Sequence, residues 1–294
     1  MENTTSGGGT YTYAQAVYAH GTTAGLSGAT GTFTFQSTPS SPTTQPVFPL
    51  NGDALDFIAF YPYDPANTLP LASLNTYPID ITHQIPIGTG NGVRADFMWT
   101  KTPSPYSLSS PPSGGAIELN FEHLLVKLVV KITRDVVSLP TTWSGSTAAT
   151  ATIKNAVKEA TVDLTAGTVA PSTTSVMDVA MRKETWKTGG GGTVPDTIIF
   201  EAILMPQTFD GNPSALDSLI VTVPVGSATR YYKSSLTNLF ANFNGTGSAL
   251  TAFTEKTKYT LIADLKGNML TNISGIINPW LDGGQGSGVA HEQP

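Results

Sequence analysis

The sequence predicts an all-β fold built from sandwiches, and three observations carry that prediction. Short segments rich in Val, Ile, Thr, Tyr and Phe recur along the whole chain. Clusters of Gly, Pro, Ser and Asn separate these segments, as turns separate strands. The 29 glycines and 21 prolines leave no room for a long helix, because both residue types disfavour helix interiors. Regularly spaced short strands of this kind are typical of β-sandwiches.

The expected strands follow one another from the first residues to the last. In the first half they cover 10–19, 31–37, 55–63, 77–84 and 95–101. In the second half they cover 151–164, 176–187, 197–209, 217–225, 228–235 and 258–267, with one short helix at 235–241. The stretch SLPTTWSGSTAAT (138–150) has the composition of a linker. We therefore expect two domains, residues 1–137 and 138–294.

In the most apolar long run, FEHLLVKLVVKITRD (121–135), the spacing of the apolar residues is compatible with either a helix or a strand. Its apolar residues can be placed on one face of a helix, but its valines and isoleucine favour a strand. As a strand, the even positions from Leu124 to Ile132 form an apolar face, with Lys127 and Lys131 opposite. Before His123 the apolar residues occupy odd positions, so the phase slips there. We expect two strands that meet at a kink, or alternatively a helical turn inserted at 122–125.

Composition excludes several classes of function. The net charge is −6 and the sequence pI is about 5.1, which argues against a nucleic-acid partner. Only 12% of residues are charged, about half of the ~25% that is usual in globular proteins. Cysteine is absent, so the chain has no disulfide, thiolate nucleophile or cysteine metal site. No run of apolar residues reaches the roughly 20 that a transmembrane helix needs.

No motif for catalysis, metal or cofactor binding is present. The four histidines do not pair at the spacings of a zinc site. Glu122 and His123 are adjacent in an expected strand, so their side chains point to opposite faces and cannot act together. There is no GxSxG motif, carboxylates form no evident pair, and no glycine-rich loop joins a strand to a helix. We therefore predict that the chain is not an enzyme, with no cofactor, no metal and no catalytic residue.

The aromatic residues offer only weak ligand candidates. Trp143 and Trp186 lie among polar residues and are candidates for exposure and for stacking on a sugar ring. Trp99, Tyr61 and Tyr63 are expected in the core, as most aromatic residues of β proteins are.

Several segments, taken in order, resemble the fimbrillin family of surface fimbriae in anaerobic Gram-negative bacteria. The chain is identified as a Mfa-like or FimA-like pilus subunit on motifs that span residues 49–284. These are PLNGDALDFIAFYPYDP (49–65), ADFMWTKT (95–102), IELNFEHLLVKLVVKI (117–132), ILMPQTF (203–209), KYTLIADL (258–265) and INPWLDGG (277–284).

The resemblance implies two tandem β-sandwich domains of transthyretin-like or immunoglobulin-like topology and no catalysis. It implies a lipoprotein precursor that is exported, displayed at the outer membrane and polymerised with other pilus subunits by strand donation. Stalk subunits of the family are cleaved after a basic residue, yet the first Lys or Arg here is Arg94. Three alternatives stay open: a tip or anchor subunit, maturation by another protease, or a chain that begins beyond the cleavage site. The absent lipidated cysteine and signal peptide agree with the last.

Two functions follow from the sequence. The first is a fimbrial subunit, structural or at the tip, that acts in adhesion. The second is a monomeric surface-displayed module that binds a glycan or a protein of a host or bacterial surface. Two segments are candidate donor strands, and each is equally compatible with an ordinary strand of its own domain. The first, residues 9–20, carries Tyr11, Tyr13 and Val17 on one face. The second, residues 270–281, is apolar and carries Ile273, Ile276, Ile277 and Trp280.

Overall fold

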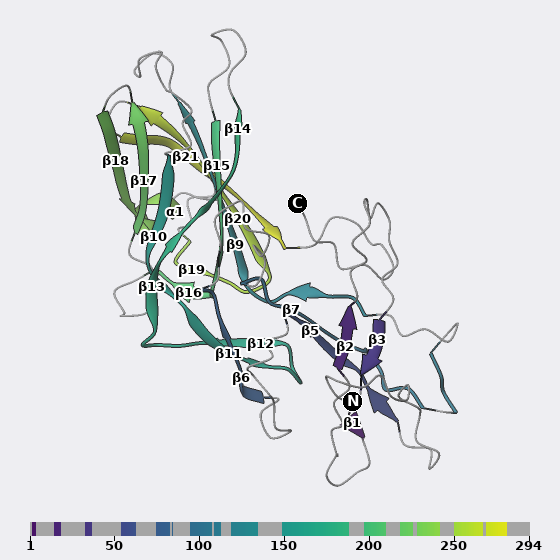
Figure 1. Cartoon of the computed structure of the whole chain (residues 1–294). Coiled ribbons are helices and arrows are strands. Elements are labelled where there is room, and N and C mark those ends of the chain that lie inside the picture. The colour runs from purple at the N-terminus through teal and green to yellow at the C-terminus, as the bar shows by residue number, and fades with distance from the viewer. Residues whose placement is uncertain are drawn as a thin grey trace.

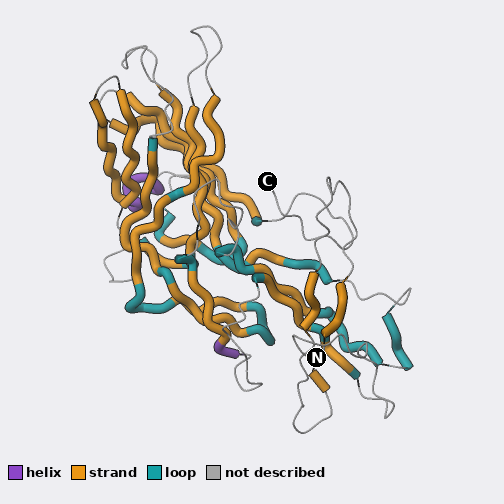
Figure 2. Tube along the Cα trace, viewed as in Figure 1, coloured by secondary structure: helices purple, strands orange, loops and turns teal. Residues whose placement is uncertain are grey.

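The computed structural model of the protein is built almost entirely of strands. It describes residues 2–3, 15–18, 33–36, 54–62, 75–82, 84, 95–107, 109–112, 119–134, 149–187, 197–209, 218–225, 228–241, 250–266 and 269–280. Strands dominate these ranges (Figure 2). One α-helix, α1 (Leu236–Phe240), lies among them, and residues 75–76 form a short 3-10 turn. The predicted all-β class and the short helix expected at 235–241 are therefore confirmed.

Two larger sheets pack face to face as a sandwich (Figure 1). The four-stranded sheet has the order β13 (Val176–Ala180), β10 (Thr150–Val157), β17 (Ser218–Val225) and β18 (Ala228–Ser235). The five-stranded sheet has the order β14 (Arg182–Lys187), β15 (Thr197–Leu204), β9 (Val126–Arg134), β20 (Thr257–Lys266) and β21 (Met269–Pro279). Every pairing in the two sheets is antiparallel except that of β9 with β20, which is parallel.

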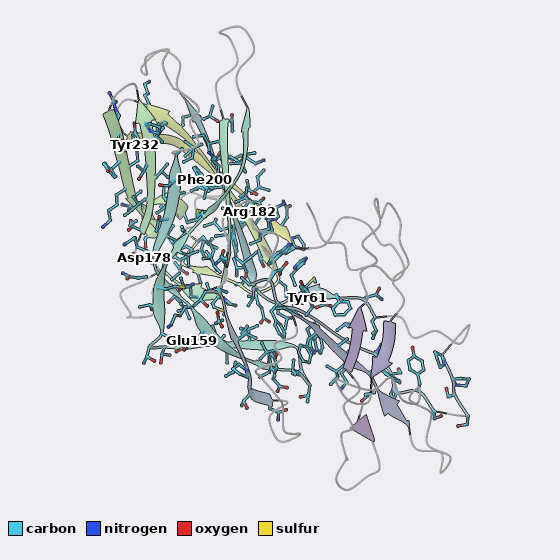
Figure 3. The ribbon with its side chains drawn as sticks, in the orientation of Figure 1. Tyr61, Glu159, Asp178, Arg182, Phe200 and Tyr232 are labelled. Atoms are coloured by element: carbon cyan, nitrogen blue, oxygen red, sulfur yellow. The ribbon has the colours of Figure 1, made fainter. Side chains whose placement is uncertain are left out.

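The core fills the space between these two sheets. It forms because apolar residues alternate along each strand, so that one face of each sheet is apolar. In β15, for example, every second residue is buried and the others are partly exposed. Phe200 of β15 and Tyr232 of β18, labelled in Figure 3, belong to one continuous buried cluster to which both sheets contribute.

β9 confirms the predicted register of the most apolar run. Leu128, Val130 and Ile132 have no exposed surface, whereas Lys127 and Lys131 on the opposite face are partly exposed. On that outer face the Lys127 ammonium pairs with Glu201 of the neighbouring β15 at 3.0 Å. Val129 on the outer face is also only 3% exposed, between Glu201 of β15 and Thr260 of β20 in register.

The predicted break near His123 is a change of sheet. A short strand, β8 (Glu122–His123), pairs with β7 (Met98–Lys101), and β9 then starts three residues after His123 in a different sheet. Leu124 and Leu125 lie between the two strands and are fully buried. The Leu124 amide donates to the Phe97 carbonyl at 2.9 Å, so the link is held to both sheets without a helical turn.

The two lateral sides of the sandwich differ. On one side β13 and β14 are almost continuous, and the buried Met181 between them carries the chain from the four-stranded to the five-stranded sheet. On the other side the edge strands are β18 and β21. Helix α1 begins where β18 ends, contacts both edge strands and buries Leu236, Leu239 and Phe240. Ser235 caps this helix, since its hydroxyl accepts a hydrogen bond from the Asn238 amide.

The smaller sheets lie at the lower end of the sandwich and to its lower right in Figure 1. A three-stranded sheet has the order β12 (Thr168–Pro171), β11 (Glu159–Asp163) and β6 (Tyr77–Asp80), and another has β5 (Ile58–Tyr61), β7 and β8. The paired strands are β1 (Glu2–Asn3) with β4 (Leu55–Asp56), β2 (Gln15–Tyr18) with β3 (Phe33–Gln36), and β16 (Gln207–Thr208) with β19 (Ala252–Phe253).

Trp99 joins the first of these sheets to the second. Its indole Nε1 donates to the Leu164 carbonyl at 2.8 Å, and its ring lies over Gly167 in the turn between β11 and β12. Gly167 has a positive φ of 65°, and a Cβ added there would come within 2.5 Å of the Trp99 ring. The turn therefore requires glycine for its backbone and for the close approach of the indole.

Three expectations on position have different outcomes. Trp99 packs against the core as predicted. Tyr61 does not, because it is the last residue of β5 and its side chain is 42% exposed; the core expectation was wrong there. Tyr63 lies outside the described residues. The division at 137/138 stays a prediction, and β9, which precedes it, is hydrogen-bonded to β15 and β20, which follow it.

Candidate functional site: the edge strand β21 and its seat

β21 is the edge strand of the five-stranded sheet. It pairs only with β20, in an antiparallel register that runs from Thr257 opposite Pro279 to Lys266 opposite Met269. Among the described residues no second strand pairs with its outer edge, although helix α1 contacts the strand. A long, uncovered edge strand is a ready template for strand pairing between molecules, and most proteins shield such an edge.

The side chains of β21 are more exposed than those of the inner strands. Ile276 is 49% exposed and Ile277 is 36% exposed, and Ser274, Asn278 and Pro279 are exposed as well. Ile276 lies opposite Thr260, and Ile277 lies opposite the buried Tyr259. Because they are consecutive in a strand, Ile276 and Ile277 point to opposite faces of the sheet, so each face of β21 carries one partly exposed isoleucine.

Trp280, directly after β21, is buried, in contrast to the residues before it. Its side chain is only 7% exposed and stacks on the His123 imidazole, with ring centroids 3.9 Å apart and ring planes 3° from parallel. His123 is itself buried, and its Nδ1 lies 2.8 Å from the Asp96 carboxylate. A carboxylate only accepts hydrogen bonds, so the geometry fits an Nδ1–H that donates to Asp96 and fixes the ring. We call His123 and Asp96 the Trp280 seat.

Backbone hydrogen bonds attach the same end of β21 to the link between β8 and β9. The Trp280 amide donates to the Lys256 carbonyl at 2.9 Å, and the Lys256 amide donates to the Leu125 carbonyl at 3.0 Å. Lys256 adopts a positive φ of 58° to do so, and its ammonium pairs with Glu122 at 2.9 Å on the solvent side. β21 is thus joined at its end to residues 96–125 of the first half of the chain.

The seat positions a strand and has no catalytic geometry. Glu122 and His123 point to opposite faces of β8, as predicted: Glu122 is exposed and His123 is 5% exposed. A ring that is covered by an indole and bonded to a buried carboxylate offers no open position for a substrate. The expectation that His123 is a hydrogen-bonded strand residue at a break is confirmed.

The structure brings the second group of candidate residues together. Ile273, Ile276 and Ile277 lie on β21, with Trp280 immediately beyond it. Of the first group, Val17 lies on β2 opposite Thr34 of β3, whereas Tyr11 and Tyr13 fall outside the described residues. The roles assigned to both groups stay predictions.

The weak ligand candidates, Trp143 and Trp186, stay predictions. Trp186 lies on β14 opposite Ile198, and Trp143 is outside the described residues. An exposed aromatic residue that was not singled out from the sequence is Tyr231 of the edge strand β18, which is 73% exposed. Asp96 and Lys256 were also missed as partners of β21. Neither belongs to a motif, because their role comes from contacts between segments distant in sequence.

Titratable groups elsewhere have local structural causes for their shifted pKa values. The Lys158 side chain lowers the pKa of Glu159, the Thr165 hydroxyl lowers that of Asp163, and the Lys154 ammonium lowers that of Asp178. Within the described ranges, no three His, Asp or Glu side chains gather as a metal site would require. The same ranges contain no helix that could span a membrane.

Comparison with known proteins identifies a family and a fold. The model of the fimbrillin-like family matches residues 2–280. The structure is similar to that of a candidate cell adhesion protein from Bacteroides uniformis, at 22% identity and a TM-score of 0.58, over 85% of this chain and 80% of that one. A second candidate cell adhesion protein, from Bacteroides ovatus, matches at 15% identity and a TM-score of 0.50, over 84% of this chain and 76% of that one. No curated protein sequence matches.

The chain belongs to the fimbrillin-like family, whose members are pilus subunits and adhesins and not enzymes. The resemblance read from the ordered motifs and the prediction of a non-enzymatic protein are thereby confirmed. The family places the chain in a cell-surface appendage together with other pilus subunits.

Proposed function

We propose that the protein is a fimbrial subunit that polymerises by exchanging β21 between copies. In this arrangement β21 leaves β20 of its own chain and pairs with β20 of the next. The observation that carries the proposal is the combination of a single strand neighbour with exposed isoleucines: β21 contacts only β20 in its sheet, and Ile276 and Ile277 are uncovered.

The physical basis of the exchange is β-augmentation. A departing β21 leaves one row of β20 amide and carbonyl groups without a partner, and a donated strand satisfies them again. Because the incoming strand has the same sequence, it re-forms the same pairs, such as Ile276 opposite Thr260. The exchange therefore conserves the contacts of the monomer, and each donor chain is also an acceptor, which gives an open chain of subunits.

The partners that follow are other fimbrial subunits, either further copies or related chains, with adhesion to a host or bacterial surface as the purpose of the appendage. We also propose export of a lipid-anchored precursor to the outer membrane. A stalk, a tip and an anchor position each remain compatible with a donor strand at β21. The segment around Tyr11, Tyr13 and Val17 is the alternative donor, and β2 within it pairs with β3 alone.

Cysteine cross-linking tests the exchange directly, because the chain has no cysteine of its own. One variant carries Thr260→Cys on β20 and another carries Ile276→Cys on β21. These residues face each other in register, and the Cα atoms of such pairs lie about 4.5–5.5 Å apart, within the range that a disulfide accepts. A mixture of the two variants under assembly conditions is expected to form disulfide-linked dimers, which require β21 of one chain to lie on β20 of the other.

The control is a chain that carries both substitutions. Oxidised as a monomer, it should close the disulfide internally, hold β21 in place and fail to polymerise until it is reduced. Filaments seen by electron microscopy without any mixed disulfide would refute β21 as the donor. They would favour residues 9–20 as the donor segment. A protein that stays monomeric under every condition would favour the second function, a surface-displayed binding module.

A further inference from the structure

We infer that the Trp280 seat sets the register of the exchanged strand, and that in a fimbria it receives Trp280 of a second copy of the chain. This inference rests on the proposed exchange of β21. It adds the residues that decide where the donated strand stops and which strands are accepted.

The register of an edge strand is fixed by its buried side chains. Backbone hydrogen bonds in a sheet do not depend on sequence, so a strand can slip by two residues and keep its faces. Buried side chains normally prevent such a slip. Along β21 the described side chains from Ser274 to Pro279 are exposed or partly exposed, so they hold the register weakly. Trp280 is the buried exception, and a slip by two residues would remove its indole from His123.

The Trp280 seat does not depend on β21 for its own shape. His123 is held in β8, where it pairs with Met98 of β7, and its ring is held by the 2.8 Å contact with Asp96. Lys256, which accepts the Trp280 amide through its carbonyl, is itself held by Leu125. The two residues of the seat and the Lys256 carbonyl thus belong to one chain and are held by contacts other than those with β21. An indole supplied by another chain would meet the same surface.

The strand that fits both β20 and the Trp280 seat of an acceptor chain must carry an indole at its end. Pairing along β20 occupies only the five-stranded sheet, whereas the seat lies at the link between that sheet and β8. A donated β21 with a tryptophan at its end would therefore contact both the five-stranded sheet and β8 of the acceptor. The partner that fits is a strand whose end carries an indole at the spacing from Ile276 to Trp280, and a second copy of this chain provides it.

Register is measured with the single-cysteine mixtures. Thr260→Cys with Ile276→Cys reports the native register, and Thr260→Cys with Ser274→Cys reports a shift by two residues. In the native background the shifted cross-link should be minor. Adding Trp280→Ala to the donor should raise the ratio of shifted to native cross-link roughly two- to tenfold, the factor that corresponds to one lost aromatic pair. Asn278→Ala on the same strand, with an exposed side chain, is the matched control and should leave the ratio unchanged.

Complementation shows whether the seat acts between chains. A Trp280→Ala chain can accept but not donate well, and a His123→Ala chain can donate but not accept well. Each alone should form far fewer filaments than the native chain. Mixed together, they should form dimers with one native junction, because Trp280 of the His123→Ala chain meets the intact seat of the other. Glu122→Ala, which changes the neighbouring exposed residue, should polymerise as the native chain does.

The outcomes separate this inference from the proposed function. If native chains give the mixed disulfide but the two alanine variants keep native register and filament yield, the seat is refuted while strand exchange stands. If native chains give no mixed disulfide, both fail. Should an alanine variant not fold, as judged by circular dichroism, Trp280→Phe replaces it. Its smaller ring should still raise the shifted cross-link above that of Asn278→Ala, and an equal ratio would overturn the inference.

Discussion

Replacing His123 or Glu122 by alanine should have very different effects, although the two residues are adjacent. His123 is buried, contacts Asp96 at 2.8 Å and stacks on Trp280. Glu122 is exposed, and its carboxylate pairs with the Lys256 ammonium at 2.9 Å in contact with solvent. The comparison therefore tests the buried side of β8 against its exposed side within a single pair of residues.

The magnitude follows from the contacts. Loss of a buried hydrogen-bond partner costs about 1–3 kcal/mol, since Asp96 loses His123 in a place with little water. Loss of a stacked aromatic pair adds about 0.5–1.5 kcal/mol. His123→Ala should therefore lower the free energy of unfolding by about 2–4 kcal/mol. Glu122→Ala removes one exposed ion pair, and its effect should stay within about 1 kcal/mol.

Equilibrium unfolding in urea, followed by circular dichroism, measures both variants against the native chain. With an unchanged m-value, the shift of the midpoint reports the difference in stability. Native-state hydrogen exchange would in addition show earlier opening of β21 in His123→Ala, because the anchor of its end is lost. Equal midpoints for the two variants would refute the argument that the Trp280 seat stabilises the monomer.

Three further changes have defined outcomes. Gly167→Ala should lower stability by roughly 1–3 kcal/mol, because Gly167 has a positive φ and an added Cβ would meet the Trp99 ring; thermal unfolding measures it. Leu128→Ala should cost about 2–5 kcal/mol in urea unfolding, since the side chain is fully buried in β9. Hydrogen bonds from Thr165 lower the pKa of Asp163, so the stability this carboxylate adds is present above its usual pKa and lost as the pH falls through the lowered pKa. Asp163→Asn should therefore be less stable than the native chain at neutral pH, and urea midpoints measured down to about pH 2 should converge.

Alternation along single strands was enough to predict which residues face the core. Leu128 and Lys131 were assigned to opposite faces of the run at 121–135, and both lie as predicted. The break at His123 was predicted from a change in phase. The sequence did not indicate that the two pieces belong to different sheets, because alternation identifies a face and not a neighbour. The parallel pairing of β9 with β20 could not be predicted from the sequence for the same reason.

Segment 151–164 shows a second limit. Its apolar pattern predicts one strand, yet it forms β10 and β11 in different sheets. Lys158 stands between them: its amide donates to Ser175 and its carbonyl accepts from Ile81, so its backbone groups bond outside both ladders. A polar residue on an exposed strand face and one at a change of sheet look alike in a sequence.

The role of the candidate donor segment 270–281 stays a prediction, but the structure shows where its residues lie. Ile276, Ile277 and Trp280 were grouped as apolar residues of one segment, and the structure places the first two on β21 and the third just beyond it. It also divides them, since the isoleucines are exposed and the tryptophan is buried. That division depends on His123 and Asp96, which only the tertiary fold brings to Trp280.

The difference between the edge strands explains why β21, and not another edge, is suited to exchange. β14 continues from β13 through the buried Met181, so its removal would open both sheets. β18 runs directly into α1, whose buried side chains, including Phe240, would be exposed if β18 left. β21 also contacts α1 but does not continue into it: one end follows β20 after Gly267 and Asn268, and the other is held by Trp280. Release of β21 breaks its pairing with β20 and its contacts with α1 and with the Trp280 seat. A stacked indole at this position is therefore expected to affect both the folding of the monomer and the assembly of the polymer.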